Sequence, residues 1–382
     1  MKKALMISCF EWYKNRLEPI REILIERGYE VTILTSDFSH GLKKPFPDSS
    51  KRSECTYIHV PQYKKNISIQ RMFSHWCFGK TVGNYIRKYK PDLIYLLVPP
   101  NNTARYCSAY KRRNPESVFI ADIIDIWPEG MPLPDKLRKS LPARIWKNLR
   151  DKSLISADYV FTECRLFQEQ LKGILDPSRT KTLHLFKNQS EEQKNLIKNI
   201  VELRSFNAAD PIKLAYVGSM NHLLDIDGIC QVLRTIHNMG YKTELHAIGD
   251  GLNKENFETA VQKTGCKAFF YGCSFDEMKK INILAPCNAA FNIMKPGVLV
   301  GLTIKSIDYF AYGLPVINNI KGDTWSVVQE NAIGINICDE GVQESQIEEL
   351  LHIEGNRVLQ VYKDYFERDS FVSAVKSASC IP

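Results

Sequence analysis

The sequence lacks several patterns that mark whole classes of protein. Its eleven cysteines are scattered singly from Cys9 to Cys380, with no C-x-x-C pair, so neither a disulfide framework nor a zinc site is indicated. The eight histidines show no H-E-x-x-H or similar ligand spacing. No run approaches the roughly 18 consecutive apolar residues that a membrane span needs, and there is no low-complexity segment or short-period repeat. These absences point away from metalloproteins, disulfide-rich domains and integral membrane proteins.

The start of the chain predicts a strand. A signal peptide is the alternative for an N-terminus that begins Met-Lys-Lys, but the apolar stretch at residues 4–10 is short and no small-residue cleavage site follows. We therefore expect a cytoplasmic protein.

Length and composition predict two folded domains. The 382 residues exceed the roughly 250 to 300 at which single cores stop growing. Hydrophobic residues make up 44% of the chain and charged residues 25%, as in ordinary globular proteins.

The charge is uneven along the chain. Residues 1–190 hold 33 Lys and Arg against 19 Asp and Glu, a net charge of +14, whereas residues 191–382 hold 18 against 24, a net charge of −6. The basic half suggests an anionic partner: a phospholipid surface, a lipid pyrophosphate or nucleic acid. Nucleic acid is the weakest of these, because no recognised module or stacking aromatic platform is present. A solvated basic face is the alternative explanation.

Strand-like and helix-like segments alternate in both halves. The first half has apolar strands at residues 4–10, 30–35, 93–98, 118–124 and 159–162, with helical stretches at 17–27, 82–89 and 143–155. After the polar stretch 187–211, strands recur at 213–217, 243–248, 268–271, 289–293 and 314–318, and helices at 226–238, 254–263, 276–284 and 305–312. This alternation predicts an α/β chain with two doubly wound parallel sheets. We expect domains at residues 1–190 and 191–365, and a final helical segment at 366–382.

Four segments of the second half place glycine or charged residues directly after a predicted strand. They are Y-V-G-S-M-N at 216–221, A-I-G-D-G at 247–251, F-Y-G-C at 270–273 and T-I-K-S-I-D-Y-F-A-Y-G-L-P-V-I at 303–317. Glycine lets the backbone approach a phosphate, and amides before a helix can donate to oxyanions. In the last segment Lys305 can hold a pyrophosphate, and Asp308, one turn later, can accept ribose hydroxyl protons. Ordinary turns and a surface helix are the alternatives for each segment taken alone.

In this order and spacing, the four segments resemble the C-terminal donor domain of retaining GT-B glycosyltransferases, in the large family that makes bacterial surface polysaccharides. That family builds its nucleotide-sugar site from a Y-V-G segment, an I-G-D-G turn, a glycine after the next strand and a P-S-K-L-F-E-Y-M-A-x-G-x-P-V-I helix. The likeness covers most of residues 212–320. Two weaker segments, R-G-Y-E-V-T at 27–32 and D-I-I-D-I-W-P-E at 122–129, resemble the family's G-H-E-V-T and R-D-x-W-P-E. The resemblance implies the GT-B fold, with two Rossmann-like domains facing a cleft.

The resemblance also implies the site and its chemistry. A nucleoside-diphosphate sugar, UDP-linked, is the expected co-substrate, and its sugar is transferred with retention and without a protein nucleophile. Asp125 and Lys305 are the expected catalytic residues, although Asp125 could instead cap the turn before Trp127. No metal or other cofactor is expected, because Lys305 and a helix dipole take the metal's place. The expected donor-binding residues are Gly218, Ser219, Asn221, Gly249, Asp250, Gly272, Cys273, Lys295, Ile304, Ser306 and Asp308.

Several positions depart from the family's pattern. The family places an Arg and a Lys after the first glycine, where this chain has Ser219 and, approximately, Leu224. Its E-x7-E pattern falls on Val300 and Asp308, and the loop at residues 8–16 lacks the usual glycine pair. A catalytically silent GT-B subunit that binds a nucleotide sugar or a partner enzyme is therefore the main alternative. A sugar-nucleotide 2-epimerase would need a set of acidic and histidine groups that we do not identify.

The acceptor is expected in the basic half. A polyprenyl-pyrophosphate-linked or other glycan acceptor at an anionic membrane fits its charge, and it places the protein at the inner face of the cell membrane in capsule or O-antigen synthesis. The candidate membrane-contact segments are residues 63–76, with Lys64, Lys65, Arg71, Phe73 and Trp76, and residues 138–146.

Overall fold

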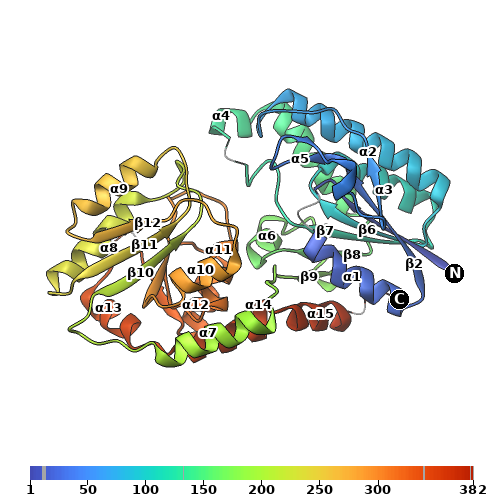
Figure 1. The fold of residues 1–382 in the computed structure, drawn as a ribbon. Helices are drawn as coiled ribbons and strands as arrows, with labels where there is room; N and C mark the ends of the chain where they lie inside the picture. The colour runs from blue at the N-terminus through green and yellow to red at the C-terminus, as the bar shows by residue number, and fades with distance from the viewer. Residues whose placement is uncertain (11–13, 132, 339, 379, 382) are drawn as a thin grey trace. The chain divides into compact units, whose positions relative to one another are not determined.

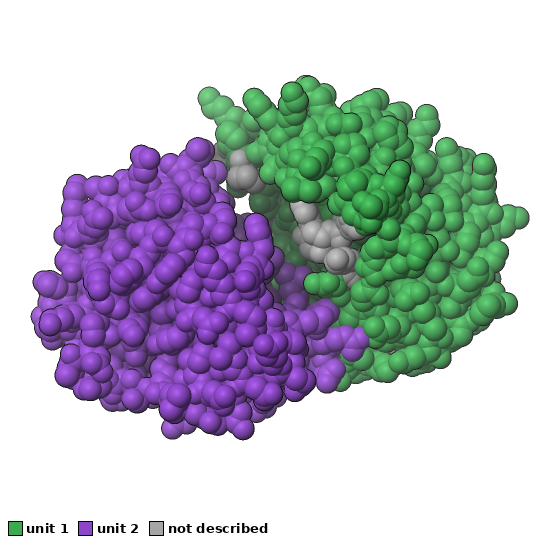
Figure 2. All heavy atoms as spheres, viewed as in Figure 1, with its two compact units in different colours: residues 1–184, 371–382 green, residues 185–370 purple. Residues whose placement is uncertain are grey.

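The computed structural model describes residues 1–10, 14–131, 133–338, 340–378 and 380–381. The chain forms two compact units, residues 1–184 with 371–382 and residues 185–370 (Figure 2). We call them the N-terminal unit and the C-terminal unit. The divisions at 184 and 370 differ from the boundaries expected at 190 and 365. Lys187 already belongs to the C-terminal unit, because it is ion-paired there with Asp308 and Glu277.

The N-terminal unit is built on a seven-stranded parallel sheet in the order β5-β2-β1-β6-β7-β8-β9. All six residues of β6 are buried, as expected for a strand covered on both faces. A short antiparallel pair, β3 (Phe38–Ser39) and β4 (Lys44–Pro45), lies outside this sheet. The strands of the sheet are β1 (Lys2–Ser8), β2 (Tyr29–Ser36), β5 (Cys55–Ile58), β6 (Leu93–Val98), β7 (Val118–Ile123), β8 (Tyr159–Thr162) and β9 (Thr180–Thr182).

Helices α2, α3 and α5 pack side by side in the N-terminal unit (Figure 1). Helix α1 is fixed to the sheet by a buried ion pair in which Arg16 Nε and Asp122 Oδ2 are 2.7 Å apart. Arg16 also lies 5.4 Å from the ring centroid of Phe371 on α15, so the C-terminal helix packs with the first one. The helices of this unit are α1 (Lys14–Glu26), α2 (Ile69–Tyr89), α3 (Asn101–Arg113), α4 (Asp135–Arg138), α5 (Leu141–Leu154), α6 (Arg165–Gln170) and, for most of its length, α15 (Arg368–Ser377).

The C-terminal unit has a six-stranded parallel sheet in the order β12-β11-β10-β13-β14-β15. Helix α8 packs on α9 and α13, whereas α14 packs on α7 and α11. The strands are β10 (Ile212–Val217), β11 (Thr243–Ile248), β12 (Lys267–Phe270), β13 (Ala289–Asn292), β14 (Val316–Asn318) and β15 (Gly334–Asn336). The helices are α7 (Glu191–Leu203), α8 (Ile226–Asn238), α9 (Lys254–Gln262), α10 (Glu277–Leu284), α11 (Ile304–Ala311), α12 (Asp323–Asn331), α13 (Glu344–Leu351) and α14 (Gly355–Phe366).

In each unit the direction of strand succession reverses once, between β1 and β6 and between β10 and β13. Open parallel sheets bind ligands outside the carboxyl ends of the strands at such a switch point. The predicted α/β class with two doubly wound parallel sheets is therefore confirmed, and each unit offers one such position. Within the described residues, no helix combines the length and the apolar character that crossing a membrane requires.

Candidate functional site

A cavity of about 340 Å³ opens at the switch point of the C-terminal unit. Its walls come from the loop after β10, the segment after β13 and the first turn of α11. This volume lies within the range of small-molecule sites. Five of the predicted site residues line it: Gly218, Ser219, Asn221, Ile304 and Lys305. We call it the Lys305 pocket.

Lys305 carries the positive charge of this pocket. Its Nζ lies 5.4 Å from the ring centroid of Tyr216, and no carboxylate of the described residues is ion-paired with it. Burial lowers the pKa of Lys305 to about 8. The ammonium is therefore still present at pH 7, half-buried and without a counterion in the described part of the chain.

The first turn of α11 adds hydrogen-bond donors to the same pocket. Thr303 is the N-cap, and its side chain accepts the amide of Ser306 at 3.1 Å. The amides of Ile304 and Lys305 have no partner within the described residues, as is usual for the first turn of a helix. These donors and the positive end of the helix dipole favour an anion at this position.

A row of asparagine amides fixes where α11 begins. Thr303 Oγ1 donates to Asn292 Oδ1 at 2.9 Å, Asn292 donates to Asn318 at 2.8 Å, and Asn318 donates to Asn336 at 2.7 Å. Asn292, Asn318 and Asn336 are the last residues of β13, β14 and β15. The row is an asparagine ladder that crosses three strands and ends on the cap of α11. Sequence reasoning missed it. Asn318 ends the strand predicted at 314–318 and Asn292 is the residue before the last of the strand predicted at 289–293, but the strand that ends at Asn336 was not predicted.

The loop after β10 is held by the next loop of the sheet. The amide of Gly218 donates to the carbonyl of Ile248 at 3.0 Å, so it is not available to a ligand. The amide of Ser219 has no partner among the described residues, so it can donate to a ligand. Gly249 packs directly on this loop, since a Cβ at Gly249 would lie 1.9 Å from the carbonyl oxygen of Gly218.

The other predicted donor-binding residues lie outside the lining of the pocket. Gly249 and Gly272 support the loop from behind, and the amide of Gly249 donates to the carbonyl of Gly272 at 2.9 Å. Ser306 is buried, and its hydroxyl donates to the carbonyl of Thr303 at 2.7 Å. Three others, Asp250, Cys273 and Lys295, are exposed.

Asp308 lies in a separate cluster of charges. Lys187 Nζ is 2.6 Å from Asp308 Oδ1 and is also paired with Glu277, while Lys280 is 2.6 Å from Glu277. Tyr312 donates its hydroxyl to Glu277. Burial opposes ionisation of Glu277, but the two lysines and the hydroxyl outweigh it and lower its pKa to about 2. A ribose bound by Asp308 would have to share the carboxylate with Lys187.

The chemistry that the lining of the Lys305 pocket offers is electrostatic. It contains a cation, hydroxyls, amides and apolar side chains, but neither an acidic side chain nor a histidine. Within the described residues, no group of three or more His, Cys, Asp or Glu is placed to hold a metal ion. The arrangement suits binding of an anionic group and stabilisation of negative charge.

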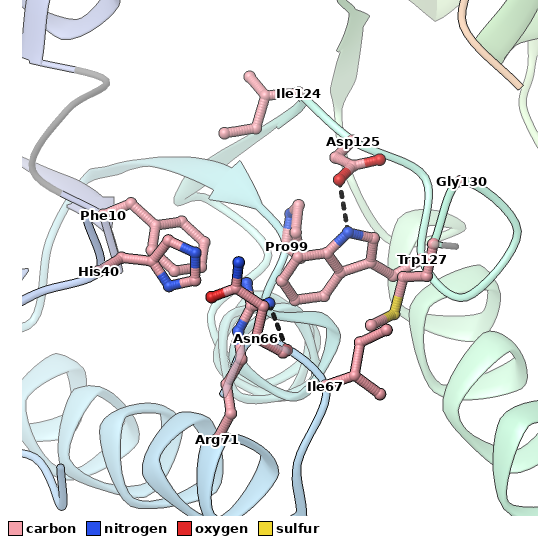
Figure 3. A pocket seen from close by; sticks show the side chains of 11 residues that line it. Phe10, His40, Asn66, Ile67, Arg71, Pro99, Ile124, Asp125, Trp127 and Gly130 are labelled. Atoms are coloured by element: carbon pink, nitrogen blue, oxygen red, sulfur yellow. Dashed lines mark hydrogen bonds between the residues drawn. The ribbon is translucent and has the colours of Figure 1, made fainter. Parts of the chain in front are cut away.

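The N-terminal unit has its own cavity, of about 270 Å³, at the carboxyl ends of β1, β6 and β7. Asp125, Trp127 and Arg71 line it (Figure 3). The carboxylate of Asp125 accepts the amide of Ile126 at 2.8 Å and the indole N–H of Trp127 at 2.5 Å. Burial raises the pKa of Asp125, and these hydrogen bonds oppose that rise. Asp125 therefore both orders the turn and faces the pocket, so the two alternatives for it are compatible.

The turn after Asp125 is anchored by a fully buried arginine. Arg150 on α5 donates to both carboxylate oxygens of Glu129, at 2.9 and 3.0 Å, and to the carbonyl of Trp127 at 2.9 Å. Glu129 thus serves to hold the segment. Removing one partner of a buried pair of this kind typically costs about 3–5 kcal/mol.

Arg71 is a correction to the sequence-based expectation. We expected it on a membrane-facing surface, but it is only 8% exposed, with its guanidinium 4.5 Å from the ring centroid of Trp127. Arg71 lies in the first turn of α2, where its amide donates to the side chain of the N-cap residue Ser68. Its side chain is on the buried side of the helix. Phe73 and Trp76, on the same helix, are exposed as expected.

No family model and no curated protein matches this sequence. Solved structures do match over nearly the whole chain. The apo form of the lipopolysaccharide outer core galactosyltransferase WaaB has a TM-score of 0.68 at 12% identity, covering 99% of both chains. Anabaena Alr3699/HepE in complex with UDP has a TM-score of 0.63 at 12% identity, again over 99% of both chains. A putative UDP-N-acetylglucosamine 2-epimerase from Listeria monocytogenes has a TM-score of 0.53 at 13% identity, covering 99% of this chain and 96% of that one.

These neighbours include both transferases and an epimerase, so the likeness shows a shared fold and does not identify a reaction. The likeness covers 99% of this chain, including both of its units, each with a parallel sheet and a switch point. This chain therefore has the GT-B fold.

Proposed function

We propose that this protein is a glycosyltransferase that takes a sugar from a nucleoside diphosphate, UDP in the first instance, bound in the Lys305 pocket. The observation that carries the proposal is the ammonium of Lys305 beside the amides of the first turn of α11, at the switch point of the sheet. Neither the ammonium nor these amides have a partner among the residues that the structure describes. A diphosphate supplies the negative charge that this position lacks. Among the fold neighbours, Anabaena HepE was solved with UDP and with UDP-glucose, which supports UDP as the first donor to test.

The proposed chemistry needs no protein nucleophile. When the bond between the sugar and the β-phosphate breaks, negative charge builds on the phosphate oxygens. Lys305, the amides of Ile304 and Lys305 and the amide of Ser219 are the groups that would stabilise it. We propose transfer with retention at the sugar carbon, as the sequence resemblance implies. The lining has no acidic or histidine side chain for proton abstraction, which favours a transferase over an epimerase.

For the acceptor, we propose a glycan or a polyprenyl-pyrophosphate-linked sugar held by the N-terminal unit near Asp125, in the assembly of a surface polysaccharide such as capsule or O-antigen. Support comes from α2, which contributes Arg71 to the lining of the pocket and carries apolar side chains on its exposed side. Ile69, Met72, Phe73 and Trp76 are between 47% and 82% exposed. Such a face, with Lys64 and Lys65 beside it, fits peripheral contact with an anionic membrane.

The test of donor binding is calorimetric titration with UDP, UDP-glucose and GDP. Lys305→Ala should weaken UDP binding about 10- to 100-fold, the effect of losing a hydrogen bond from a charged group. Lys242→Ala is the matched control, because Lys242 is exposed and precedes β11, at the end of the sheet opposite the pocket. Titrations in EDTA and in Mg²⁺ should give the same UDP affinity. If the wild-type protein binds none of these nucleotides, the enzyme proposal fails.

A second candidate is a silent subunit that binds a nucleotide sugar without turning it over. It is favoured by the two positions where the family resemblance expects cations: Ser219 is exposed and uncharged, and Leu224 is buried in the apolar core. Hydrolysis of a bound UDP-sugar, or its transfer by the chain alone, would rule this candidate out. Nucleotide binding with no turnover of any donor would support it.

A further inference from the structure

The pocket of the N-terminal unit contains a buried cation that the proposed donor chemistry does not use. Arg71 is 8% exposed, and its Nε is buried without a hydrogen-bond partner in the described ranges of the chain. Its Nη1 donates to the backbone carbonyl of Asn66 at 2.8 Å. No carboxylate of the described residues lies within ion-pair distance of the guanidinium. A buried charge in proteins is normally paired, so this one is an exception that calls for an explanation.

The surroundings of Arg71 hold it in place without neutralising it. The guanidinium lies 4.5 Å from the ring centroid of Trp127, 5.7 Å from that of Phe10 and 5.9 Å from that of Tyr63. Aromatic faces attract a cation without using its N–H donors. Of these donors, Nη1 donates to Asn66 and the guanidinium is also hydrogen-bonded with Tyr63, whereas Nε has no partner among the described residues. Asp125, the acidic side chain of the pocket lining, already accepts two hydrogen bonds, from Ile126 and from Trp127.

A second cation reinforces the positive field. Lys43 donates from Nζ to the side-chain oxygen of Asn66, whose backbone carbonyl accepts Arg71. Burial, together with the charges of Arg71 and Lys43, lowers the pKa of His40 to about 3, so that ring stays neutral. One lysine and one arginine thus both donate to Asn66. Asn66 and Arg71 lie together at the wall of the cavity of about 270 Å³ (Figure 3).

We infer that this pocket binds an oxyanion, a carboxylate or phosphate group, carried by the acceptor, and that Arg71 is the residue that recognises it. The planar guanidinium presents paired N–H donors that match the two oxygens of such a group. Asp125 in the same pocket is then placed to meet a hydroxyl of the same molecule. The assignment of the anion to the acceptor rests on the proposed function, whereas the anion site itself stands on the geometry of the N-terminal unit.

The experiment uses the full chain and four probes: inorganic phosphate, glucose 1-phosphate, glucuronate and, as the neutral control, glucose. Binding is followed at constant ionic strength by the fluorescence of tryptophan, because Trp127 lines the pocket beside Arg71. We expect saturable binding of at least one anionic probe in the millimolar range, and none of glucose. Preference for glucose 1-phosphate would indicate a phosphate-bearing acceptor, and preference for glucuronate an acidic sugar.

Three variants decide the role of Arg71. Arg71→Met keeps the apolar part of the side chain and removes the charge, and it should lower the affinity for the anion at least tenfold. Arg71→Lys keeps the charge but not the planar guanidinium, and it should lower the affinity for the anion at least threefold. This variant provides the test if Arg71→Met does not fold. Lys80→Met makes the same charge change on the exposed side of α2 and should leave binding unchanged.

Two results would overturn the inference: equal anion affinity in wild type and both Arg71 variants, or no binding of any anionic probe by the wild type. Titration of the same samples with UDP separates the two proposals. Anion binding at Arg71 in a protein that does not bind UDP would uphold the site and remove its assignment to an acceptor.

Discussion

The amine of Lys305 lies 5.4 Å from the ring centroid of Tyr216, with no carboxylate of the described chain paired to it. The lysine comes from the first turn of α11 and the tyrosine from β10, so the contact joins the helix to the strand whose loop forms the opposite wall of the pocket. Because burial lowers the pKa of Lys305 to about 8, its charge is sensitive to pH in a range that is easy to reach.

Affinity for UDP should therefore fall as the pH rises through about 8, by up to tenfold per unit, because the ammonium is lost. Calorimetry from pH 7.5 to 9.5 measures this, above the second phosphate pKa of about 6. Tyr216 stays neutral there, since burial raises its pKa. Lys305→Met should bind UDP weakly and without this pH dependence. If the UDP affinity of the wild type does not change between pH 7.5 and 9.5, Lys305 does not contact the diphosphate.

The same variant should be more stable than the wild type at neutral pH. The folded pKa of about 8 lies below the ordinary value of 10.5, so the folded state disfavours the charged lysine. This cost is complete below pH 8 and disappears as the pH rises toward 10.5. Removing the charge should add about 1–3 kcal/mol to the free energy of unfolding at pH 7, and little at pH 10.5. Urea unfolding at the two pH values measures the difference.

Asp308 can be tested with the donor's own ribose. If its carboxylate accepts the 2′-hydroxyl, the wild type should bind 2′-deoxy-UDP about 10- to 100-fold more weakly than UDP, and Asp308→Asn should bind the two almost equally. If Asp308 serves only its ion pair with Lys187, the Asn variant should weaken both ligands by the same factor. Lys187→Met is the control, because it removes the ion pair and keeps the carboxylate.

Two glycines behind the Lys305 pocket should respond very differently to alanine. A Cβ at Gly249, where φ is +150°, would lie 1.9 Å from the carbonyl oxygen of Gly218, so the loop after β10 must move. We expect Gly249→Ala to lose more than about 3 kcal/mol of stability and most UDP affinity. Gly272, at φ +69°, has nothing within 4 Å of the added Cβ. Gly272→Ala should cost about 1–2 kcal/mol and keep UDP binding. Urea unfolding and calorimetry of both variants test the contrast.

The outer side of α2 should bind anionic membranes. Phe73 and Trp76 stack at 6.0 Å between ring centroids and are about half exposed. We expect the double variant Phe73→Ala, Trp76→Ala to bind phosphatidylglycerol vesicles at least tenfold more weakly, and binding to weaken further with salt. Phe275→Ala is the control, since Phe275 is 97% exposed but lies in the C-terminal unit. If the wild-type protein does not bind such vesicles at low salt, the membrane proposal is contradicted.

The central strands were predictable because they are buried and therefore apolar, whereas the edge strands β5, β9 and β15 were not predicted. The runs at residues 93–98, 159–162 and 243–248 agree with β6, β8 and β11 to the residue. Helix α3 was missed because its sequence, N-N-T-A-R-Y-C-S-A-Y-K-R-R, is polar and buries small residues such as Ala104 and Ser108 instead of an apolar stripe. Helix α7 falls in the polar stretch of the expected domain boundary. Its capping box, Ser190 with Gln193, was a signal that could have revealed it.

The site was predictable only where its residues are close in sequence. Gly218, Ser219 and Asn221 follow one strand, and Ile304 and Lys305 begin one helix. The local sequence pattern was therefore enough to predict them as site residues. The roles of Lys187 and Arg71 depend on partners far away in the chain. Lys187 meets Asp308 across 121 residues, and the burial of Arg71 results from packing against Phe10 and Trp127. No single segment carries that information.

The asparagine ladder gives the start of α11 an anchorage that does not titrate. Asn292, Asn318 and Asn336 are neutral amides, and Thr303, which they hold, is neutral as well. Changes of pH or ionic strength that weaken ion pairs elsewhere leave such hydrogen bonds intact. The ladder therefore keeps the start of the helix in place when the pH changes. If the proposed nucleotide binding depends on pH, that dependence reports on the amine of Lys305 and not on movement of the helix.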